Sequence, residues 1–412
     1  MNVLFDLVMR RFIRQGTLLI RFADGRQRRY GHGEPHAGME LVDIQTERDL
    51  LINPGLHFGE CYMDGRLRPL GCLLYELMDL LILNVEGGGH VPANLMQRGR
   101  KLVRLWSQHN PAPRSRRNVA HHYDLNGRLY SLFLDRDRQY SCAYFPRGDE
   151  TLEEAQEAKK RHIAAKLRLD RPGLEVLDIG SGWGGMALTL ARDYGARVTG
   201  ITLSTEQLEA SRARAAAEGL ADRVRFELVD YRLVRKRFDR IVSVGMFEHV
   251  GVGHYDTFFR QIDRCLQDDG IALVHSIGRR EGPGATNAWL DKYIFPGGYS
   301  PALSETFAAI EKSGLWVTDC EILRLHYART IAHWRRRFAA NRDVIASLYD
   351  ERFCRMFEVY LVGSELAFRR QGHLNFQIQL SRRIDAVPLT RDYMGDAERA
   401  TGVSVPSTVD AD

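Results

Sequence analysis

The sequence lacks any run of uncharged residues long enough to cross a bilayer. Its longest apolar stretch, Leu70 to Val85, is interrupted by Glu76 and Asp79, whereas a membrane-spanning helix needs about 18 uncharged residues. The amino-terminal apolar run is broken by Asp6 and is followed by no small-residue cleavage site, so we expect no secretory signal. These absences predict a soluble, cytoplasmic protein.

Cysteine is scarce and lacks the spacing of a metal site. The six cysteines are scattered without a CxxC pair, which indicates a reducing compartment and predicts no bound metal. Hydrophobic residues make up 44% of the 412 residues and charged residues 27%, a balance that excludes a disordered or fibrous protein. At about 150 residues per domain, this length predicts two or three domains.

Acidic residues are absent from Gln97 to Ala120, a segment that carries seven basic side chains. Pro111 and Pro113 break any helix there. A solvated linker and a surface for anionic lipid headgroups are both consistent with this composition. A nucleic-acid partner is disfavoured, because Trp106 is the segment's one aromatic residue and forms no stacking platform. We expect a basic linker over residues 96–120.

The regions on either side of this linker differ in pattern. Residues 1–95 combine a short amphipathic start, the strand-like TLLIRF and the apolar run that ends at Val85, and they predict a smaller α+β domain. From about Leu174, short apolar runs alternate with helical stretches, which is typical of an α/β fold with a doubly wound, mostly parallel sheet. We expect this second domain to cover 121–395, with a flexible tail over 396–412. The seven expected strands cover 175–179, 197–203, 224–229, 239–244, 270–277, 316–325 and 374–380.

A glycine-rich loop follows the first strand of the α/β region. The sequence Gly180-Ser181-Gly182-Trp183-Gly184-Gly185 allows a ligand to approach the backbone near a helix N-terminus. The pattern alone is weak, because many nucleotide-binding folds share it. NAD is disfavoured, because no carboxylate stands at residues 200–204, at the end of the second strand. Asp230, after the third strand, stands where class I methyltransferases carry an acid for the adenine amino group, unless it is simply a turn residue.

Polar side chains follow the fourth and fifth strands. Glu248 comes soon after the fourth strand, and His275 lies at the end of the fifth. Ligands bind beyond the carboxyl ends of strands in open α/β sheets. A lone histidine at a strand end is more often a structural residue, but a Glu and a His on adjacent strand ends favour a functional site.

Four longer motifs resemble the cyclopropane-fatty-acyl-phospholipid synthase family, which includes the mycolic acid cyclopropane synthases. The resemblance covers roughly residues 118 to 395, and the upstream region suits the extra domain of the bacterial phospholipid enzymes. Two departures are Arg128, where the family commonly has an acid, and Ser181, where it often has cysteine. The motifs are Tyr140-Ser141-Cys142-Ala143-Tyr144-Phe145, Val176 to Gly185, Val242 to Gly251 and Lys292 to Gly298.

The resemblance implies a class I methyltransferase with a Rossmann-like fold, peripherally associated with the inner face of the membrane. Such an enzyme adds a methylene carbon from S-adenosylmethionine across a cis double bond of an unsaturated phospholipid chain. It also implies a bound bicarbonate ion and is consistent with a homodimer, on which the sequence gives no direct evidence. The residues implied around bicarbonate are Cys142, Glu248, His275, Ile277 and Tyr327, with Gly245 nearby. The residues implied for the cofactor are Tyr123, Tyr140, Ser141, Gly180, Gly182, Thr202, Gln207, Asp230 and Tyr231.

The implied chemistry assigns a role to each of these groups. Methyl transfer to an alkene leaves a carbocation, which needs a dry pocket and which Phe247, Tyr144 and Tyr327 could stabilise; Phe247 and Tyr144 could equally be core aromatics. Ring closure then requires a base, and we expect bicarbonate to serve. His275, Tyr327 and the backbone N–H groups of Cys142 and Ile277 would donate hydrogen bonds to it. Glu248 would accept the bicarbonate hydroxyl and orient His275.

Three other functions fit parts of the sequence. A sibling enzyme on the same scaffold would resolve the cation to a methylene- or methyl-branched chain, and the sequence does not separate the two products. An RNA or small-molecule methyltransferase is supported only by the basic linker. A non-catalytic lipid-binding protein is disfavoured by the intact set of Glu248, His275 and Tyr327.

Overall fold

The computed structural model describes residues 2–86 and 127–400, which form two compact units. The first unit joins residues 2–86 to two later segments, Gly284–Gly298 and Ile331–His373. The second unit holds the remaining described residues. This division differs from the contiguous one expected from the sequence, which assigned both later segments to the catalytic domain. The basic linker lies outside the described residues, and the expected tail overlaps a helix that ends at Ala400.

The first unit contains the expected α+β arrangement. Its four strands form a sheet in the order β2-β1-β3-β4, with β1 parallel to β3 and antiparallel to β2. Its strands are β1 (Gly16–Arg21), β2 (Gln27–His32), β3 (His36–Leu41) and β4 (Leu67–Pro69). Its helices are α1 (Val3–Phe12), α2 (Ile44–Ile52), α3 (Pro54–Met63), α4 (Leu74–Glu86), α13 (Ala288–Tyr293), α16 (Arg342–Leu348), α17 (Glu351–Arg369) and most of α15 (His326–Ala340).

Side-chain contacts explain why the two later segments belong to this unit. The hydroxyl of Tyr62 on α3 donates to Glu358 on α17 at 2.6 Å. The indole of Trp289 on α13 packs so closely on α3 that a Cβ added at Gly59 would lie 2.4 Å from its Nε1. A glycine at position 59 is therefore required for this helix contact.

The second unit is built on a seven-stranded sheet in the order β10-β11-β9-β8-β5-β6-β7. All seven strands expected from the sequence are present, and the sheet is mostly parallel, with β10 and β11 antiparallel. The strands are β5 (Glu175–Ile179), β6 (Arg197–Thr202), β7 (Val224–Leu228), β8 (Phe238–Val244), β9 (Leu266–Arg279), β10 (Trp316–Leu323) and β11 (His373–Ser381). The helices of this unit are α8 (Gly127–Phe133), α9 (Leu152–Lys166), α10 (Gly185–Tyr194), α11 (Thr205–Ala217), α12 (Tyr255–Cys265), α14 (Leu303–Glu311) and α18 (Asp392–Ala400), with the 3₁₀ turns η1 (Tyr231–Leu233), η2 (Phe247–His249) and η3 (Val252–His254).

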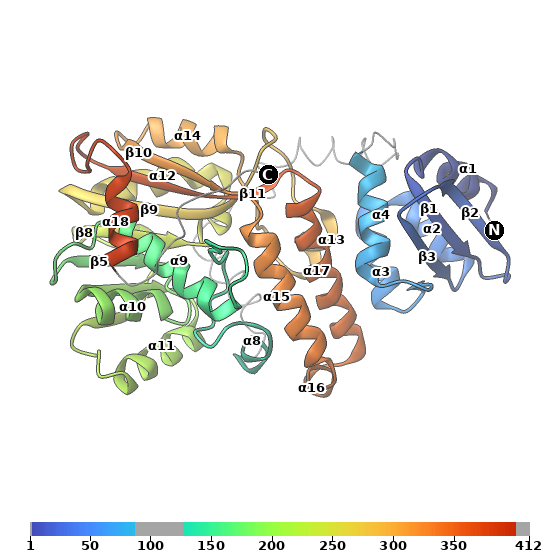
Figure 1. The fold of residues 1–412 in the computed structure, drawn as a ribbon, viewed down its shortest axis with the longest axis horizontal. Coiled ribbons are helices and arrows are strands. Elements are labelled where there is room, and N and C mark those ends of the chain that lie inside the picture. The colour runs from blue at the N-terminus through green and yellow to red at the C-terminus, as the bar shows by residue number, and fades with distance from the viewer. Residues whose placement is uncertain (1, 87–126, 401–412) are drawn as a thin grey trace. The chain divides into compact units, whose positions relative to one another are not determined.

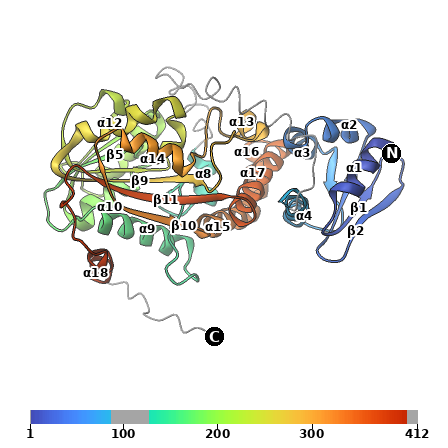
Figure 2. The same cartoon turned by 90° about the horizontal axis from the view of Figure 1, so that it is seen from above.

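Helices cover both faces of this sheet (Figures 1 and 2). On one face, α9, α10 and α11 pack against alternate strand residues such as Val176 and Leu273. On the other face, α12 and α14 pack against the intervening residues, including Leu177 and Val274. Because the strands are sandwiched in this way, a ligand can reach the sheet only at the strand ends.

None of the described helices combines the length and the apolar character that crossing a bilayer requires.

Candidate active site

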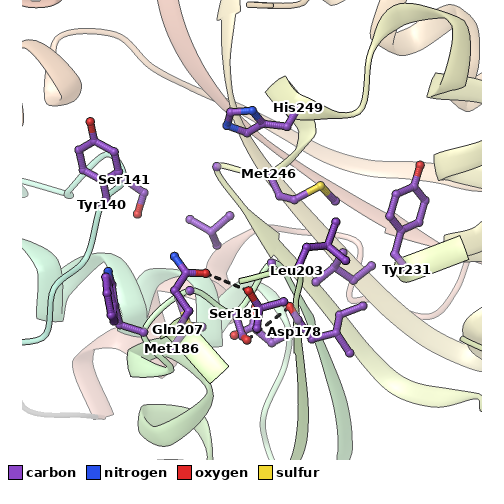
Figure 3. A pocket seen from close by; sticks show the side chains of 18 of the residues that line it. Tyr140, Ser141, Asp178, Ser181, Met186, Leu203, Gln207, Tyr231, Met246 and His249 are labelled. Carbon is purple, nitrogen blue, oxygen red and sulfur yellow. Dashed lines mark hydrogen bonds between the residues drawn. The ribbon is translucent and has the colours of Figure 1, made fainter. Parts of the chain in front are cut away.

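A pocket opens at the carboxyl ends of β5, β6, β7 and β8 (Figure 3). The pocket is lined by eight of the nine residues expected at the cofactor, namely Tyr140, Ser141, Gly180, Gly182, Thr202, Gln207, Asp230 and Tyr231. The ninth, Tyr123, lies outside the described residues. Gly245, which was expected near bicarbonate, also lines the pocket.

The glycine loop between β5 and α10 forms the floor of this pocket. Gly180 and Gly182 have φ angles of +82° and +54°, a region that residues with a Cβ rarely adopt. A Cβ at Gly180 would also lie 2.9 Å from the Met246 side chain. The loop is held to β6 because the amides of Gly180 and Ser181 both donate to the carbonyl of Ile201, at 3.0 and 2.9 Å.

Hydrogen bonds within the protein orient two polar side chains that line the pocket, Gln207 and Asp230. The Thr202 hydroxyl donates to the amide oxygen of Gln207 at 2.9 Å (Figure 3), so the NH₂ of Gln207 is the group it can offer a ligand. Asp230 accepts from the guanidinium of Arg232 at 2.8 and 2.6 Å. Sequence reasoning did not anticipate this ion pair, which holds the Asp230 carboxylate in place beside the pocket.

Asp178, near the end of β5, is a pocket residue that sequence reasoning missed. Its side chain is buried, and its Oδ2 has no hydrogen-bond partner within the described part of the chain. Burial raises its pKa to about 7. A buried carboxyl group with one oxygen unpartnered among the described residues, beside a glycine loop, fits a ligand that carries positive charge, as S-adenosylmethionine does through its ammonium and sulfonium groups. A carboxylic acid within the apolar run EVLDI was the available sequence signal.

Lys159 on α9 supports the opposite wall of the pocket and was also missed. Its buried Nζ donates to Oε1 of Gln139 at 2.5 Å and to the hydroxyl of Ser141 at 3.0 Å. Both acceptors belong to residues that line the pocket. Burial lowers the pKa of Lys159 to about 8.

Cys142 follows this wall, and its thiol is fully buried. Its Sγ donates to the carbonyl of Ala143 at 3.3 Å, and burial raises its pKa, so it has the character of a packed, protonated thiol. The amide of Ala143 donates to the hydroxyl of Thr330 at 3.0 Å. This bond ties the Cys142 segment to the first turns of α15, the helix that carries Tyr327.

Glu248, in η2, lies against the end of β9. Its Oε1 accepts from the amide of Ile277 at 2.6 Å, whereas its buried Oε2 has no partner of normal hydrogen-bond geometry among the described residues. Burial raises its pKa to about 7, with bonds from Ile277 and Ser276 acting in the opposite direction. In this structure Glu248 occupies the Ile277 N–H that was expected to donate to bicarbonate.

His275 is buried in β9, next to the amide of Gly245, which donates to its carbonyl at 2.9 Å. Its ring contacts the amides of Asn375 and Gln377 on β11, at 3.4 and 3.1 Å. The prediction that Glu248 orients His275 is wrong in this structure, since the side chains that meet the ring come from β11. Burial lowers the pKa of His275 to about 3, so the imidazole is neutral.

The three aromatic residues expected to stabilise a cation lie in different surroundings. Tyr327 is 8% exposed at the start of α15. Tyr144 stacks on the rings of His162 and His326, with centroids 4.2 and 5.1 Å away. Phe247 is fully buried against aromatic residues of α12 and is a core residue rather than part of the pocket wall.

The strand order, the glycine loop and the acid after the third strand together define a class I methyltransferase dependent on S-adenosylmethionine. The family model for mycolic acid cyclopropane synthetase matches residues 111–378. The chain therefore belongs to that family, and it is an S-adenosylmethionine-dependent cyclopropane or fatty acid methyltransferase.

Individual relatives agree with this assignment. The chain is 39% identical over 361 residues to the cyclopropane-fatty-acyl-phospholipid synthase of Escherichia coli K12, covering 86% of this chain and 90% of that one. It is 42% identical over 289 residues to a probable fatty acid methyltransferase of Pseudomonas putida, covering 67% and 73%. The crystal structure of the mycolic acid cyclopropane synthase CmaA1 with SAH and CTAB superposes with a TM-score of 0.61 at 33% identity, covering 66% of this chain and 98% of that one.

Proposed function

We propose that the protein forms cyclopropane rings on unsaturated acyl chains of membrane phospholipids, with bound bicarbonate as the general base. The observation that best supports this function is the buried Glu248 carboxyl group beside the end of β9, with one oxygen fixed by Ile277 and the other unpartnered among the described residues. A buried acceptor in this position can accept a hydrogen bond from the hydroxyl of a bicarbonate ion and so orient its basic oxygen.

The residues around the pocket divide the remaining work. When bound, S-adenosylmethionine supplies an electrophilic methyl group. The glycine loop, Gln207 and Asp230 would hold the cofactor. Tyr327 and the backbone N–H of Cys142 are the donors proposed for the anion, together with the neutral imidazole of His275. The burial of Glu248 and His275 keeps water from this region, which protects a carbocation from capture.

The phospholipid part of the proposal is supported by the Escherichia coli relative's name and by the surface of α1. Val3, Leu4 and Leu7 are 81%, 57% and 47% exposed, although all three are large apolar side chains. Arg10 and Arg11 follow in the last turn of the same helix. Apolar side chains next to basic ones are typical of helices that lie in the interface of an anionic membrane.

A second product is supported by the Pseudomonas putida relative, whose name describes a fatty acid methyltransferase. On the same site, a cation that is not closed to a ring would be resolved as a methylene- or methyl-branched chain. The placement of the base relative to the new methyl group decides between ring closure and a saturated methyl branch, because ring closure removes a proton from that group.

Product analysis with a labelled donor tests the proposal. The full-length protein is incubated with vesicles of unsaturated phospholipid and S-adenosylmethionine that carries a CD₃ group, and the acyl chains are analysed by mass spectrometry. A cyclopropane retains two deuterium atoms, whereas a saturated methyl branch retains three. Two retained atoms in a chain that resists mild catalytic hydrogenation are expected. Three retained atoms would replace the proposal with the methyl-branched product, and two in a chain that takes up hydrogen would replace it with the methylene-branched product.

The assigned role of Glu248 is tested separately. Glu248→Gln keeps an oxygen for the Ile277 amide but replaces the free acceptor with a donor. We expect turnover to fall at least a hundredfold, with affinity for S-adenosylhomocysteine unchanged within twofold by calorimetry. An equal loss of cofactor affinity would contradict the role. Removal of bicarbonate from the buffer should lower wild-type turnover, and full activity without it would exclude bicarbonate as the base.

A further inference from the structure

Strand β11 presents an unusual polar face to helix α9. Its apolar residues Phe376, Ile378 and Leu380 belong to the core on the α12 side of the sheet. The alternate residues Asn375, Gln377 and Gln379 point the other way and are at most 1% exposed. Burying three amide side chains under one helix costs free energy unless each is hydrogen-bonded. Their hydrogen-bond partners therefore indicate how each amide is oriented.

The orientation of the Gln377 amide is set by a lysine. Nζ of Lys166, the last residue of α9, donates to Oε1 of Gln377 at 2.7 Å. The same ammonium group forms an ion pair with Glu321 on β10, which keeps it charged in a buried site. A lysine ammonium has donors and no acceptor. Gln377 must therefore turn its oxygen to Lys166 and its NH₂ group the other way.

The NH₂ group of Gln377 meets the ring of His275. Its Nε2 lies 3.1 Å from Nδ1 of His275. Because an amide NH₂ can only donate, Nδ1 has to accept and cannot carry the ring proton. In a neutral imidazole the proton is then on Nε2.

We propose that Lys166 and Gln377 are positioning residues that lock His275 in the neutral tautomer with the proton on Nε2. The lock makes Nε2–H the donor of the ring without any ionisation. The catalytic importance of this donor rests on the function proposed above, whereas the tautomer itself rests on the contacts alone.

Asn375 faces the other nitrogen of the ring. Its Nδ2 faces Nε2 of His275 at 3.4 Å, while its buried Oδ1 has no partner among the residues that the structure describes. With the proton on Nε2, two donors would face each other, and a half-turn of the amide would then satisfy both groups by bringing Oδ1 to the Nε2 proton. A small anion could take the place of this oxygen when it binds.

The charged groups around the ring favour a neutral imidazole. A positive charge on the His275 ring is disfavoured by three basic residues of α9, namely Lys159, Lys166 and His162. Glu321 on β10 acts in the opposite direction. Glu248 lies two residues away, on the amide of Ile277. The tautomer is therefore expected to stay the same between pH 6 and pH 8.

Nuclear magnetic resonance of the full-length protein with ¹⁵N-labelled histidine tests this proposal. The chain has 14 histidines, and the His275→Asn variant identifies the resonances of this ring by their loss. We expect the Nδ1 shift of an unprotonated nitrogen and the Nε2 shift of a protonated one, unchanged from pH 6 to pH 8. A protonated Nδ1 in the wild-type protein would overturn the inference. The tautomer is read on the wild-type protein itself, and the variant serves only to assign the resonances.

Two matched variants test what sets the tautomer. Gln377→Glu places a carboxylate against Nδ1 and should move the proton to that nitrogen. Gln379→Glu is the control: Gln379 lies two residues along the same buried face and donates to the carbonyl of Lys166 and to Tyr393, with no contact to His275. Its His275 shifts should match those of the wild type. An unchanged tautomer in Gln377→Glu, or the same change in both variants, would overturn the lock.

Turnover separates this inference from the proposed function. Gln377→Glu should lower kcat at least tenfold with the KM for the methyl donor within twofold, and Gln379→Glu should retain more of its kcat. If the proton moves to Nδ1 while kcat on phospholipid stays at the wild-type value, the lock is supported and the role of His275 in the proposed function fails.

Discussion

Buried carboxyl groups are the residues on which the proposed chemistry depends most. Asp178 and Glu248 are both buried, each has one oxygen without a partner among the described residues, and burial raises the pKa of each to about 7. Groups with such pKa values change charge near neutral pH, so proposed roles that need the carboxylate should depend on pH in that range.

The pH dependence of turnover should report the ionisation of Glu248. Its proposed role needs the carboxylate, and its raised pKa means that protonation begins near pH 7 rather than near pH 4.5. At saturating cofactor, kcat is expected to rise about tenfold per pH unit up to about pH 7 and then level off. Asp178→Asn is the control, and it should keep this rise of kcat with pH. If the rise is absent from the Asp178→Asn variant, it would be assigned to the ionisation of Asp178 instead.

The residues of the site were predicted unevenly. Glycines and strand-end acids could be found because the strand pattern fixes where they fall on the sheet. The partners of His275 could not be found, because nothing in the sequence of β9 says which strand will lie beside it. Asp178 was missed for a related reason, since a single acid in an apolar run gives no sign of which way it points.

Helix α9 is the element that connects the pocket to the rest of the second unit. Lys159 near its middle holds the wall formed by Gln139 and Ser141, and Lys166 at its end holds Gln377. The sequence predicted the strands that this helix covers, but helical periodicity alone did not identify buried lysines, because lysine is normally a surface residue.

Substitution of Lys159 should loosen the pocket wall. Lys159→Met keeps the length of the side chain but leaves Ser141 and Gln139 without their donor. We expect affinity for S-adenosylhomocysteine to fall about tenfold, because two hydrogen bonds that fix lining residues are lost. Calorimetric titration measures this. Lys236→Met is a control on an exposed lysine, 57% accessible, and should bind normally; equal losses in both variants would contradict the prediction.

Helix α1 should contribute to membrane binding. The double variant Leu4→Ser, Leu7→Ser removes two exposed apolar side chains, and burial of each would stabilise the bound state by about 1.5–3 kcal/mol. We expect binding to anionic vesicles in a sedimentation assay to weaken at least tenfold. Leu389→Ser, at an exposed leucine of the second unit, is the control and should bind as the wild type does. Unchanged binding of the double variant would exclude α1 from the contact.

At the scale of the whole molecule, the two units are interleaved along the chain. The strand pattern predicted the sheet of the second unit correctly, but it gave no sign that Gly284–Gly298 and Ile331–His373 pack with the amino-terminal residues. The sequence pattern of an amphipathic helix such as α17 predicts that one face is buried, but it does not identify the element that covers that face.

Deletion of residues 2–86 should therefore destabilise the remaining chain rather than release an independent domain. The face of α17 that includes Phe357 and Leu361 is buried in the first unit, and its partners α3 and α4 would be missing. We expect a low soluble yield and a melting temperature at least 10 °C below that of the full chain, by circular dichroism. Tyr62→Phe in the full chain removes only one hydrogen bond to α17, and it should lower the melting temperature far less. A truncated chain that melts like the full one would contradict this.

The position of β11 imposes an order on biosynthesis. This strand lies between β9 and β10 in the sheet but is the last of the three to leave the ribosome. Until it emerges, Trp316–Leu323 has no neighbour with which to form its ladder, and His275 lacks both amides that contact its ring. The nascent chain must therefore expose an unfinished sheet edge while Ile331–His373 is being translated, and the contacts to His275 form only once β11 has emerged.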